Sequence, residues 1–332
     1  MGNAKILGST DLIRIARDFP LTCVDLGARG GIASDLLPIS RYVDAIGFEP
    51  DQQEWERLDA DARTATHRWK SLRYLPIAVG SGATETLHIY RARGCSSLLE
   101  ANAGLADQYS RGDYFELERS HEVKTVPLDV AAAEFKFDKA EFIKIDIQGY
   151  ELEVFKSGPR LIGEHVLGIR SEIAFLPVYQ EQPLFSEIES FLRPKGMYAM
   201  GFYNLQHWRN STKSKPPWNG SKQVPFSFGQ LIHGDVLFLR DASTMRDDTE
   251  EGINKLIKTS MLALIFGYVD YAHNMLKRPG VEQLLANKYD VSVSTIVRDV
   301  SKYWSHLHRK KSIYAAIKTA RGLVKNLVGQ ER

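Results

Sequence analysis

Residues 21–31 read Leu-Thr-Cys-Val-Asp-Leu-Gly-Ala-Arg-Gly-Gly, and this stretch decides the fold. An apolar run that ends near Asp25 and then turns through glycines predicts a short buried strand whose end can approach a ligand closely. A second apolar run ends at Glu49, roughly 20 to 25 residues after the first acid, a spacing typical of an acidic residue that hydrogen-bonds a ribose diol. Together the two segments predict a nucleoside site.

The glycine spacing indicates which kind of cofactor would fit this site. A dinucleotide fingerprint, G-x-G-x-x-G, admits a pyrophosphate against a helix N-terminus. Here Asp25 heads the turn and Arg29 occupies a position that the dinucleotide pattern gives to glycine. The carboxylate disfavours an anion and favours a cofactor with a cationic end, such as the amino group and sulfonium of S-adenosylmethionine. A glycine turn that only packs a strand on a helix is the structural alternative for this segment.

A third acidic residue ends another apolar run. Residues 141–146 read Glu-Phe-Ile-Lys-Ile-Asp, and Gly149 and a helical segment from Glu151 follow. In an open α/β sheet, ligands bind beyond the carboxyl ends of the strands. We therefore expect Asp25, Glu49 and Asp146 to converge on one crevice.

At these residues the chain resembles the FkbM family of S-adenosylmethionine-dependent methyltransferases. The resemblance implies a class I methyltransferase (Rossmann-like) fold and methyl transfer to a hydroxyl of a sugar, polyketide or other secondary metabolite. One departure is Gln148, because the family more often has Glu there. The similar segments follow one another between about residues 20 and 240: Val24–Gly31, Gly47–Asp51, Ile77–Gly82, Cys95–Leu99, Val126–Asp129 and Phe142–Gly149.

The resemblance also implies a set of cofactor-binding residues. Asp25 is expected near the amino acid moiety, Arg29 at the mouth of the crevice near the methionine carboxylate, and Glu49 on the ribose. The complete set is Asp25, Gly27, Ala28, Arg29 and Gly31 in the first turn, Glu49, Ala78 and Val79 beside the adenine, and Ser97 near the methionine end.

Methyl transfer to a hydroxyl requires alignment of the oxygen with the methyl carbon and a group that accepts the proton. Asp146 is the first candidate, Glu172 at the end of the next apolar run is the second, and His207 is the third. Each has a structural alternative: Asp146 as a helix cap, Glu172 as an ion-pair partner of Arg170 or Lys144, and His207 as an incidental loop residue.

Three further residues are expected to bind the acceptor. Tyr179 and Trp208 could stack on a sugar face, with structural packing as the alternative, and His233 flanks the same region. A divalent cation on Asp146 and Glu172 is conceivable in chemical terms. The spacing of the residues does not require one, so no metal site is predicted.

Composition sets limits on the class of protein. The 332 residues suffice for one large domain with an appendage, and 43% apolar with 25% charged residues is typical of a globular protein. A net charge of +2 gives no case for a nucleic-acid partner, and two cysteines exclude a disulfide framework. Without an apolar N-terminal leader or a long apolar run, a cytoplasmic location is expected.

Alternating strand and helix patterns predict an α/β fold with a mostly parallel sheet covered on both faces. The resemblance to the FkbM family implies that this sheet has seven strands. We expect a methyltransferase domain over residues 1–242, with residues 204–230 as a candidate substrate lid, and a helical appendage over 243–332. The expected strands are 21–25, 44–48, 72–79, 85–91, 123–127, 141–146, 165–173, 196–203 and 234–240, and the main helices are 9–18, 32–42, 51–62, 98–109, 150–157 and 183–194.

The sequence pattern of the C-terminal stretch predicts a basic amphipathic helix. It could lie on the inner surface of an anionic membrane, or it could dock its apolar face on the domain or on a second copy in a homodimer. The pattern favours docking.

The leading prediction is an S-adenosylmethionine-dependent O-methyltransferase acting on a sugar, glycan or glycolipid. A polyketide or macrolide O-methyltransferase is the alternative within the same class. An NAD-type oxidoreductase and a non-catalytic scaffold are less favoured.

Overall fold

The computed structural model describes residues 11–64, 67–210 and 228–328, with side chains up to Lys310. The chain divides into two compact units. One unit runs from Pro20 to Met245, and the other joins the described residues before Pro20 to those from Arg246 onward. The N-terminal helix α2 (Asp11–Asp18) therefore groups with the C-terminal helices.

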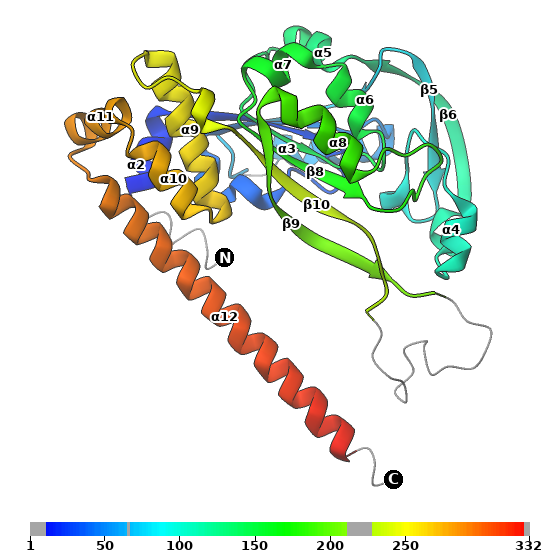
Figure 1. The fold of residues 1–332 in the computed structure, drawn as a ribbon. Coiled ribbons are helices and arrows are strands. Elements are labelled where there is room, and N and C mark those ends of the chain that lie inside the picture. The colour runs from blue at the N-terminus through cyan, green and yellow to red at the C-terminus, as the bar shows by residue number, and fades with distance from the viewer. Residues whose placement is uncertain (1–10, 65–66, 211–227, 329–332) are drawn as a thin grey trace. The chain divides into compact units, whose positions relative to one another are not determined.

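The larger unit is built on a seven-stranded sheet with the order β3-β2-β1-β7-β8-β10-β9 (Figure 1). Strands β3, β2, β1, β7 and β8 are parallel, whereas β10 pairs antiparallel with both β8 and β9. This confirms the predicted α/β class and the mostly parallel sheet. The strand bounds are β1 Leu21–Leu26, β2 Val43–Phe48, β3 Ser71–Leu75, β7 Phe142–Ile145, β8 Gly168–Ala174, β9 Met197–Trp208 and β10 Gln230–Arg240.

A smaller sheet, in the order β4-β6-β5, lies beside the first. The sequence predicted a single strand over 72–79, but Pro76 interrupts it, and the residues after the proline pair with β6 instead. The bounds are β4 Ala78–Val79, β5 Thr84–Tyr90 and β6 Leu117–Val126.

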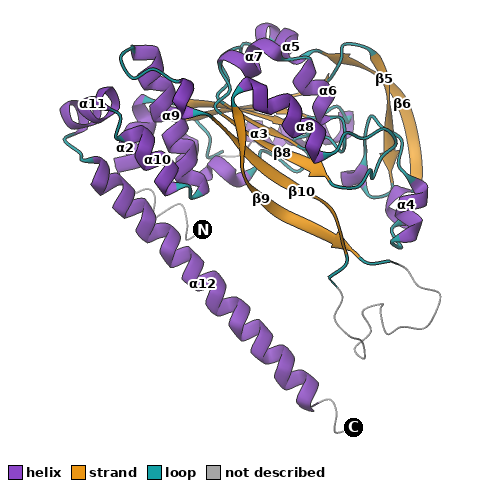
Figure 2. Ribbon diagram, viewed as in Figure 1, coloured by secondary structure: helices purple, strands orange, loops and turns teal. Residues whose placement is uncertain are grey.

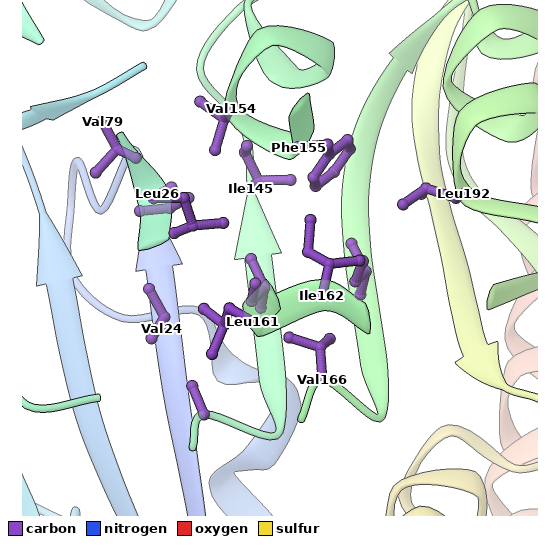
Figure 3. Close-up of a cluster of buried hydrophobic side chains, with 14 of the residues drawn as sticks. Val24, Leu26, Val79, Ile145, Val154, Phe155, Leu161, Ile162, Val166 and Leu192 are labelled. Carbon is purple, nitrogen blue, oxygen red and sulfur yellow. The ribbon is translucent and has the colours of Figure 1, made fainter. Parts of the chain in front are cut away.

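Helices α5 to α8 cover one face of the large sheet (Figure 1). Figure 3 shows Leu26 and Ile145 from the sheet packed near Val154 of α6 and Leu161 of α7. Each such fully buried side chain stabilises the fold by about 1.5–3 kcal/mol. The helices of this unit are η1 Ser34–Tyr42, α3 Gln52–Thr64, η2 Arg93–Cys95, α4 Ala103–Gln108, η3 Gly112–Phe115, α5 Leu128–Glu134, α6 Glu151–Lys156, α7 Pro159–Glu164, α8 Phe185–Leu192, η4 Arg193–Lys195 and η5 Ala242–Thr244.

The expected helices and loops differ from the structure in three places. Residues 34–42 form a 3₁₀ helix that contains Pro38. The helix expected over 98–109 begins only at Ala103, where Asn102 caps it by accepting from Leu105 N. Strand β9 continues to Trp208, which pairs with Gln230, so the ends of the expected lid are strand (Figure 2). Residues 211–227 of that lid lie outside the described residues.

The second unit is helical. Tyr289 Oη donates to Asp18 Oδ2 at 2.9 Å, and this bond joins α11 to α2. Trp304 Nε1 donates to Leu264 O at 2.8 Å and joins α12 to α9. No described helix is long and apolar enough to cross a bilayer. The bounds are α9 Glu250–Phe266, α10 Val269–Leu276, α11 Pro279–Tyr289 and α12 Val293–Val328.

Candidate active site

A cavity of about 290 Å³ opens at the carboxyl ends of β1, β2 and β7. This is the edge of the sheet where ligands bind in open α/β folds. The volume is near the lower end for small-molecule sites. The lining is part apolar and part charged, and its polar members are Arg29, Glu49, Asp51, Arg93, Ser96, Ser97, Lys144, Asp146 and Gln148.

The first turn forms one wall of the cavity with bare backbone. Gly27 has a φ of +83°, and a Cβ placed there would lie 2.0 Å from the carbonyl oxygen of Asp146. Gly27 N and Ala28 N both donate to Phe48 O, at 3.1 and 2.9 Å. Only glycine allows the turn after β1 to approach the backbone at the end of β7 this closely. Gly30 N donates to Glu54 Oε1 at 2.9 Å, which holds the rest of the turn against α3.

Glu49, directly after β2, presents a carboxylate to the cavity. Its Oε1 accepts from Asp51 N at 2.9 Å and lies 3.7 Å from Arg29 Nη2. Its Oε2 has no hydrogen-bond partner among the described residues. Burial raises the pKa of Glu49, while the Asp51 N–H and the Arg29 charge oppose that rise. The arrangement leaves one carboxylate oxygen available to a ligand hydroxyl.

Arg29 lines the cavity beside Glu49 and pairs with Asp51 at 3.2 Å. Asp51 Oδ1 in turn accepts from Gln53 N and Glu54 N and thereby caps α3. The sequence predicted that the Arg29 guanidinium lies near the methionine carboxylate of the cofactor. In the structure it pairs with Asp51 and lies near Glu49.

Asp25 lies behind the cavity wall and does not line it. The residue is fully buried, and its Oδ2 accepts from Ala33 N at 2.8 Å. Lys144 Nζ lies 3.3 Å from Asp25 Oδ1 and 3.9 Å from Asp146 Oδ2, and it donates to Gly27 O. Burial raises the pKa of Asp25 to about 6, against the opposing charge of Lys144. Lys144 therefore connects the buried carboxylate to the one at the cavity wall.

Gln148 joins Asp146 to Glu172. Its Nε2 donates to Asp146 Oδ1 at 2.7 Å and to Glu172 Oε2 at 2.8 Å. Its Oε1 accepts from Tyr179 Oη at 2.9 Å, so every polar group of the amide is used. The backbone of Gln148 is left-handed, with φ +59°, and its carbonyl accepts from Ser97 Oγ. An amide at this position can donate to both carboxylates, which a glutamate could not do.

Glu172 and His233 continue the network onto adjacent antiparallel strands β8 and β10. Glu172 Oε1 lies 3.1 Å from His233 Nδ1. Burial raises the pKa of Glu172 well above its ordinary value, and the charges of Asp146 and Glu151 add to the rise. Burial lowers the pKa of His233, against the opposing charges of Asp146 and Asp235, and thereby favours the neutral imidazole.

The expected aromatic platforms are packed inside the unit. Tyr179 is 2% exposed and Trp208 is 8% exposed, and both belong to a buried cluster with Tyr90 and Tyr109. Neither ring presents an open face. His207 is exposed on β9 and has no hydrogen bond to the Gln148 network among the described residues.

Some of the remaining predicted cofactor residues line the cavity, and others are buried behind its wall. Ala78, Val79 and Ser97 line it. Ala28 is fully buried against Leu58 and Tyr74. Gly31, with φ +108°, completes the turn without lining the cavity.

Sequence reasoning missed Lys144, the bridging role of Gln148 and the contribution of Asp51. The signal for Lys144 was a charged residue inside an otherwise apolar strand, Phe142–Ile145. A lysine is rarely buried unless it is paired. Within the part of the chain that the structure describes, no group of three or more His, Cys, Asp or Glu side chains is placed to hold a metal ion.

The strand order, with an antiparallel β10, and the cavity beyond β1, β2 and β7 are those of the class I methyltransferase fold. The model of the methyltransferase FkbM domain matches residues 25–202, more than half of the 332 residues. The chain therefore belongs to the FkbM methyltransferase family, as its motifs predicted. The methyl donor of this class is S-adenosylmethionine.

Solved structures show similarity at low identity. The FkbM methyltransferase of Methylobacillus flagellatus KT is 16% identical over 66% of this chain, with a TM-score of 0.38, and the chain spans 43% of its length. The magnesium protoporphyrin IX methyltransferase of Synechocystis PCC 6803, solved with bound S-adenosylmethionine, is 10% identical over 72% of this chain and 80% of its own, with a TM-score of 0.34. Comparison with curated proteins gave no match.

Proposed function

We propose that the protein is an S-adenosylmethionine-dependent O-methyltransferase that acts on a hydroxyl of a sugar, glycan or glycolipid. The observation that carries the proposal is the carboxylate of Glu49, with one oxygen unpartnered among the described residues, on the wall of a cavity that the glycine turn also lines. Membership in the FkbM family supports the methyltransferase chemistry.

The cavity residues fit this cofactor in chemical type. The free oxygen of Glu49 would accept from the ribose hydroxyls, and the apolar side chains of Ile77, Val79 and Leu98 would contact the adenine. Asp146 would face the cationic methionine end, with Lys144 and Asp25 holding its position from behind. We propose these roles together with those of Gly27, Arg29 and Ser97.

Bound S-adenosylmethionine supplies the methyl group, and the chain supplies alignment and a place for the proton. Asp146, at the cavity wall, is our first candidate to accept the proton of the acceptor hydroxyl. Glu172 lies behind Asp146, and Gln148 connects the two by one hydrogen bond to each. His207 has no such connection among the described residues, which makes it the weakest of the three candidates.

Two further expectations are kept as proposals. The helical C-terminal region would dock on the methyltransferase domain or on a second copy, and contact with an anionic membrane is the alternative. A cytoplasmic location accords with both. The basic residues that carry this idea continue beyond Lys310, the last residue whose side chain is described.

Calorimetric titration with S-adenosylhomocysteine and, separately, with NAD tests the proposal. We expect micromolar binding of S-adenosylhomocysteine, no binding of NAD, and at least a tenfold loss of affinity in Glu49→Ala, because the ribose loses a charged acceptor. Glu56→Ala, which changes an exposed glutamate on α3, is the matched control and should bind like the wild type. Binding of NAD in preference, or no binding at all, would refute the proposal.

A further inference from the structure

Three cationic side chains among the described residues line the cofactor cavity, and they differ in their partners. Arg29 pairs with Asp51 at 3.2 Å, and Arg93 pairs with Glu118 at 2.6 Å. Asp51 follows β2 and Glu118 lies on β6, so each arginine is held by an element other than β7. Lys144 lies on β7 itself. The cation that lines the cavity at the end of β7 is therefore Lys144.

Lys144 and Asp146 place opposite charges side by side on the cavity wall. Asp146 N donates to Leu26 O and continues the ladder of β7, so the two side chains, two residues apart, lie on the same face of the sheet. Lys144 Nζ lies 3.9 Å from Asp146 Oδ2, and both residues line the cavity. At this distance they form an ion pair without a hydrogen bond, and each can still bond a ligand.

The Lys144 ammonium has more donors than its partners in the protein use. It donates to Gly27 O at 3.3 Å and lies 3.3 Å from Asp25 Oδ1. Among the described residues, no other acceptor lies within hydrogen-bond distance of this nitrogen, which carries three N–H donors. Although burial opposes it, the charges of Asp25 and Asp146 raise the pKa of Lys144. The side chain therefore stays charged and has a donor left for a ligand.

The amino acid end of S-adenosylmethionine carries charges that match this wall. Its ammonium and carboxylate share one carbon, and the sulfonium adds a second positive charge. Lys144 and Asp146 on the wall, with Asp25 behind them, carry the opposite pattern of one positive and two negative charges. Asp146 alone would repel the carboxylate of the cofactor, so the carboxylate requires a cation next to Asp146. Such complementary charges fix the orientation of a ligand in its site.

We propose that Lys144 binds the carboxylate of the methionine end of the cofactor, beside the ammonium group that Asp146 accepts. The proposal rests on the placement of the cofactor in the proposed function, with the ribose at Glu49. It assigns the carboxylate to Lys144 in place of Arg29, which stays on the ribose side of the cavity with Asp51. Lys144 thus selects a cofactor with an intact amino acid end.

The test compares two ligands that differ only in this carboxylate, each titrated calorimetrically into the full chain. S-adenosylhomocysteine carries the carboxylate, and decarboxylated S-adenosylhomocysteine lacks it. We expect the wild type to bind the first about tenfold or more tightly than the second, as for a charged hydrogen bond. Lys144→Met should remove this preference, because the affinity for S-adenosylhomocysteine falls while that for the decarboxylated ligand does not.

A second variant covers the case in which Lys144→Met does not fold, since that change leaves Asp25 buried without its ion-pair partner. The double variant Asp25→Asn/Lys144→Met also removes the buried charge and should show the same loss of preference. Lys156→Met is the matched control, because Lys156 is an exposed lysine of α6 that pairs with Glu153 at 2.7 Å. It should bind both ligands like the wild type.

Three results would overturn the inference. The first is equal affinity of the wild type for the two ligands, and the second is a preference that the folded Lys144 variants retain. If neither Lys144 variant folds, Arg29→Gln and Arg93→Gln decide: a preference retained in both supports Lys144 as the remaining cation of the described cavity wall, and a preference lost in either is the third contrary result. Failure of the wild type to bind either ligand refutes instead the proposed function on which the inference rests.

Discussion

The site edge of the sheet has two halves that are built in different ways. Around β1 and β2, the wall is made by backbone and by residues close in sequence, with Gly27 against a carbonyl and Glu49 held by the N–H of Asp51. Around β7, it is made by the side chains of Asp146 and Gln148, which Glu172 of β8 and His233 of β10 support from behind.

The difference shows what each half depends on. The first half needs a backbone geometry that a single added carbon would destroy. The second needs the correct number of protons, because Asp146 and Glu172 share the Gln148 amide and the buried Glu172 also contacts His233. Substitutions should therefore act on the first half through sterics at every pH, and on the second through charge.

The largest effect is expected from Gly27→Ala. The new Cβ would lie 2.0 Å from Asp146 O, in a backbone conformation that alanine rarely adopts. We expect the free energy of unfolding to fall by about 3 kcal/mol or more, equally at pH 6 and pH 8, with loss of S-adenosylhomocysteine binding. Urea unfolding and calorimetry measure the two effects.

Gly94→Ala is the matched control for this substitution. Gly94 also lines the cavity, but a Cβ there meets no atom within 4 Å. The free energy of unfolding of Gly94→Ala should be within about 0.5 kcal/mol of the wild-type value. A Gly27→Ala variant as stable as Gly94→Ala would show that the turn can shift and that the first half of the site is not sterically fixed.

The contrast between a half built from local segments and a half built from distant ones also explains how much of the fold and the site could be predicted from the sequence. The strands β1, β2 and β7, the family, and the presence of Glu49 and Asp146 at one cavity followed from local segments in which pattern and chemistry agree. The placement of Asp25 did not follow, because an acid at the end of a strand can face either the ligand or the interior. In the structure, the Ala33 N–H and Lys144, the latter more than a hundred residues later in the chain, hold the Asp25 carboxylate in the interior.

The second half of the site could not be derived from sequence for a related reason. Gln148 was identified as a departure from the family, but its partners Glu172 and Tyr179 are brought to it by β8 and the loop that follows. Trp208 was expected in a loop, yet it extends β9 and packs against Tyr109. Pairing with a distant strand and burial in an aromatic cluster are tertiary effects that local patterns do not record.

A smaller and pH-dependent effect is expected from Gln148→Glu. The substitution removes both N–H donors and places a third carboxylate between Asp146 and Glu172. The folded state would hold protons more tightly than the unfolded state, so stability should fall as the pH rises. We expect a loss of about 3 kcal/mol at pH 8 and a smaller one at pH 5, measured by urea unfolding.

Gln180→Glu provides the control for added charge, because Gln180 is exposed just beyond Tyr179. It should change the stability by less than about 0.5 kcal/mol at both pH values. A loss in Gln148→Glu that is the same at pH 5 and pH 8 would mean that shape, rather than charge, governs this half of the site.

The smallest effect is expected from His233→Asn, which keeps an N–H for Glu172 but cannot titrate. Burial lowers the pKa of His233 below the ordinary 6.5, so the unfolded chain takes up this proton first as the pH falls. The contribution of His233 to stability is thus present above pH 6.5 and is lost as the pH falls toward its folded pKa. Urea unfolding measures the free energy of unfolding at each pH. Between pH 7.5 and pH 5 this free energy should fall less in the variant than in the wild type, with a difference of less than about 1 kcal/mol. His207→Asn, on the exposed face of β9, should keep the wild-type slope, and an unchanged slope in His233→Asn would place the pH sensitivity elsewhere in the network.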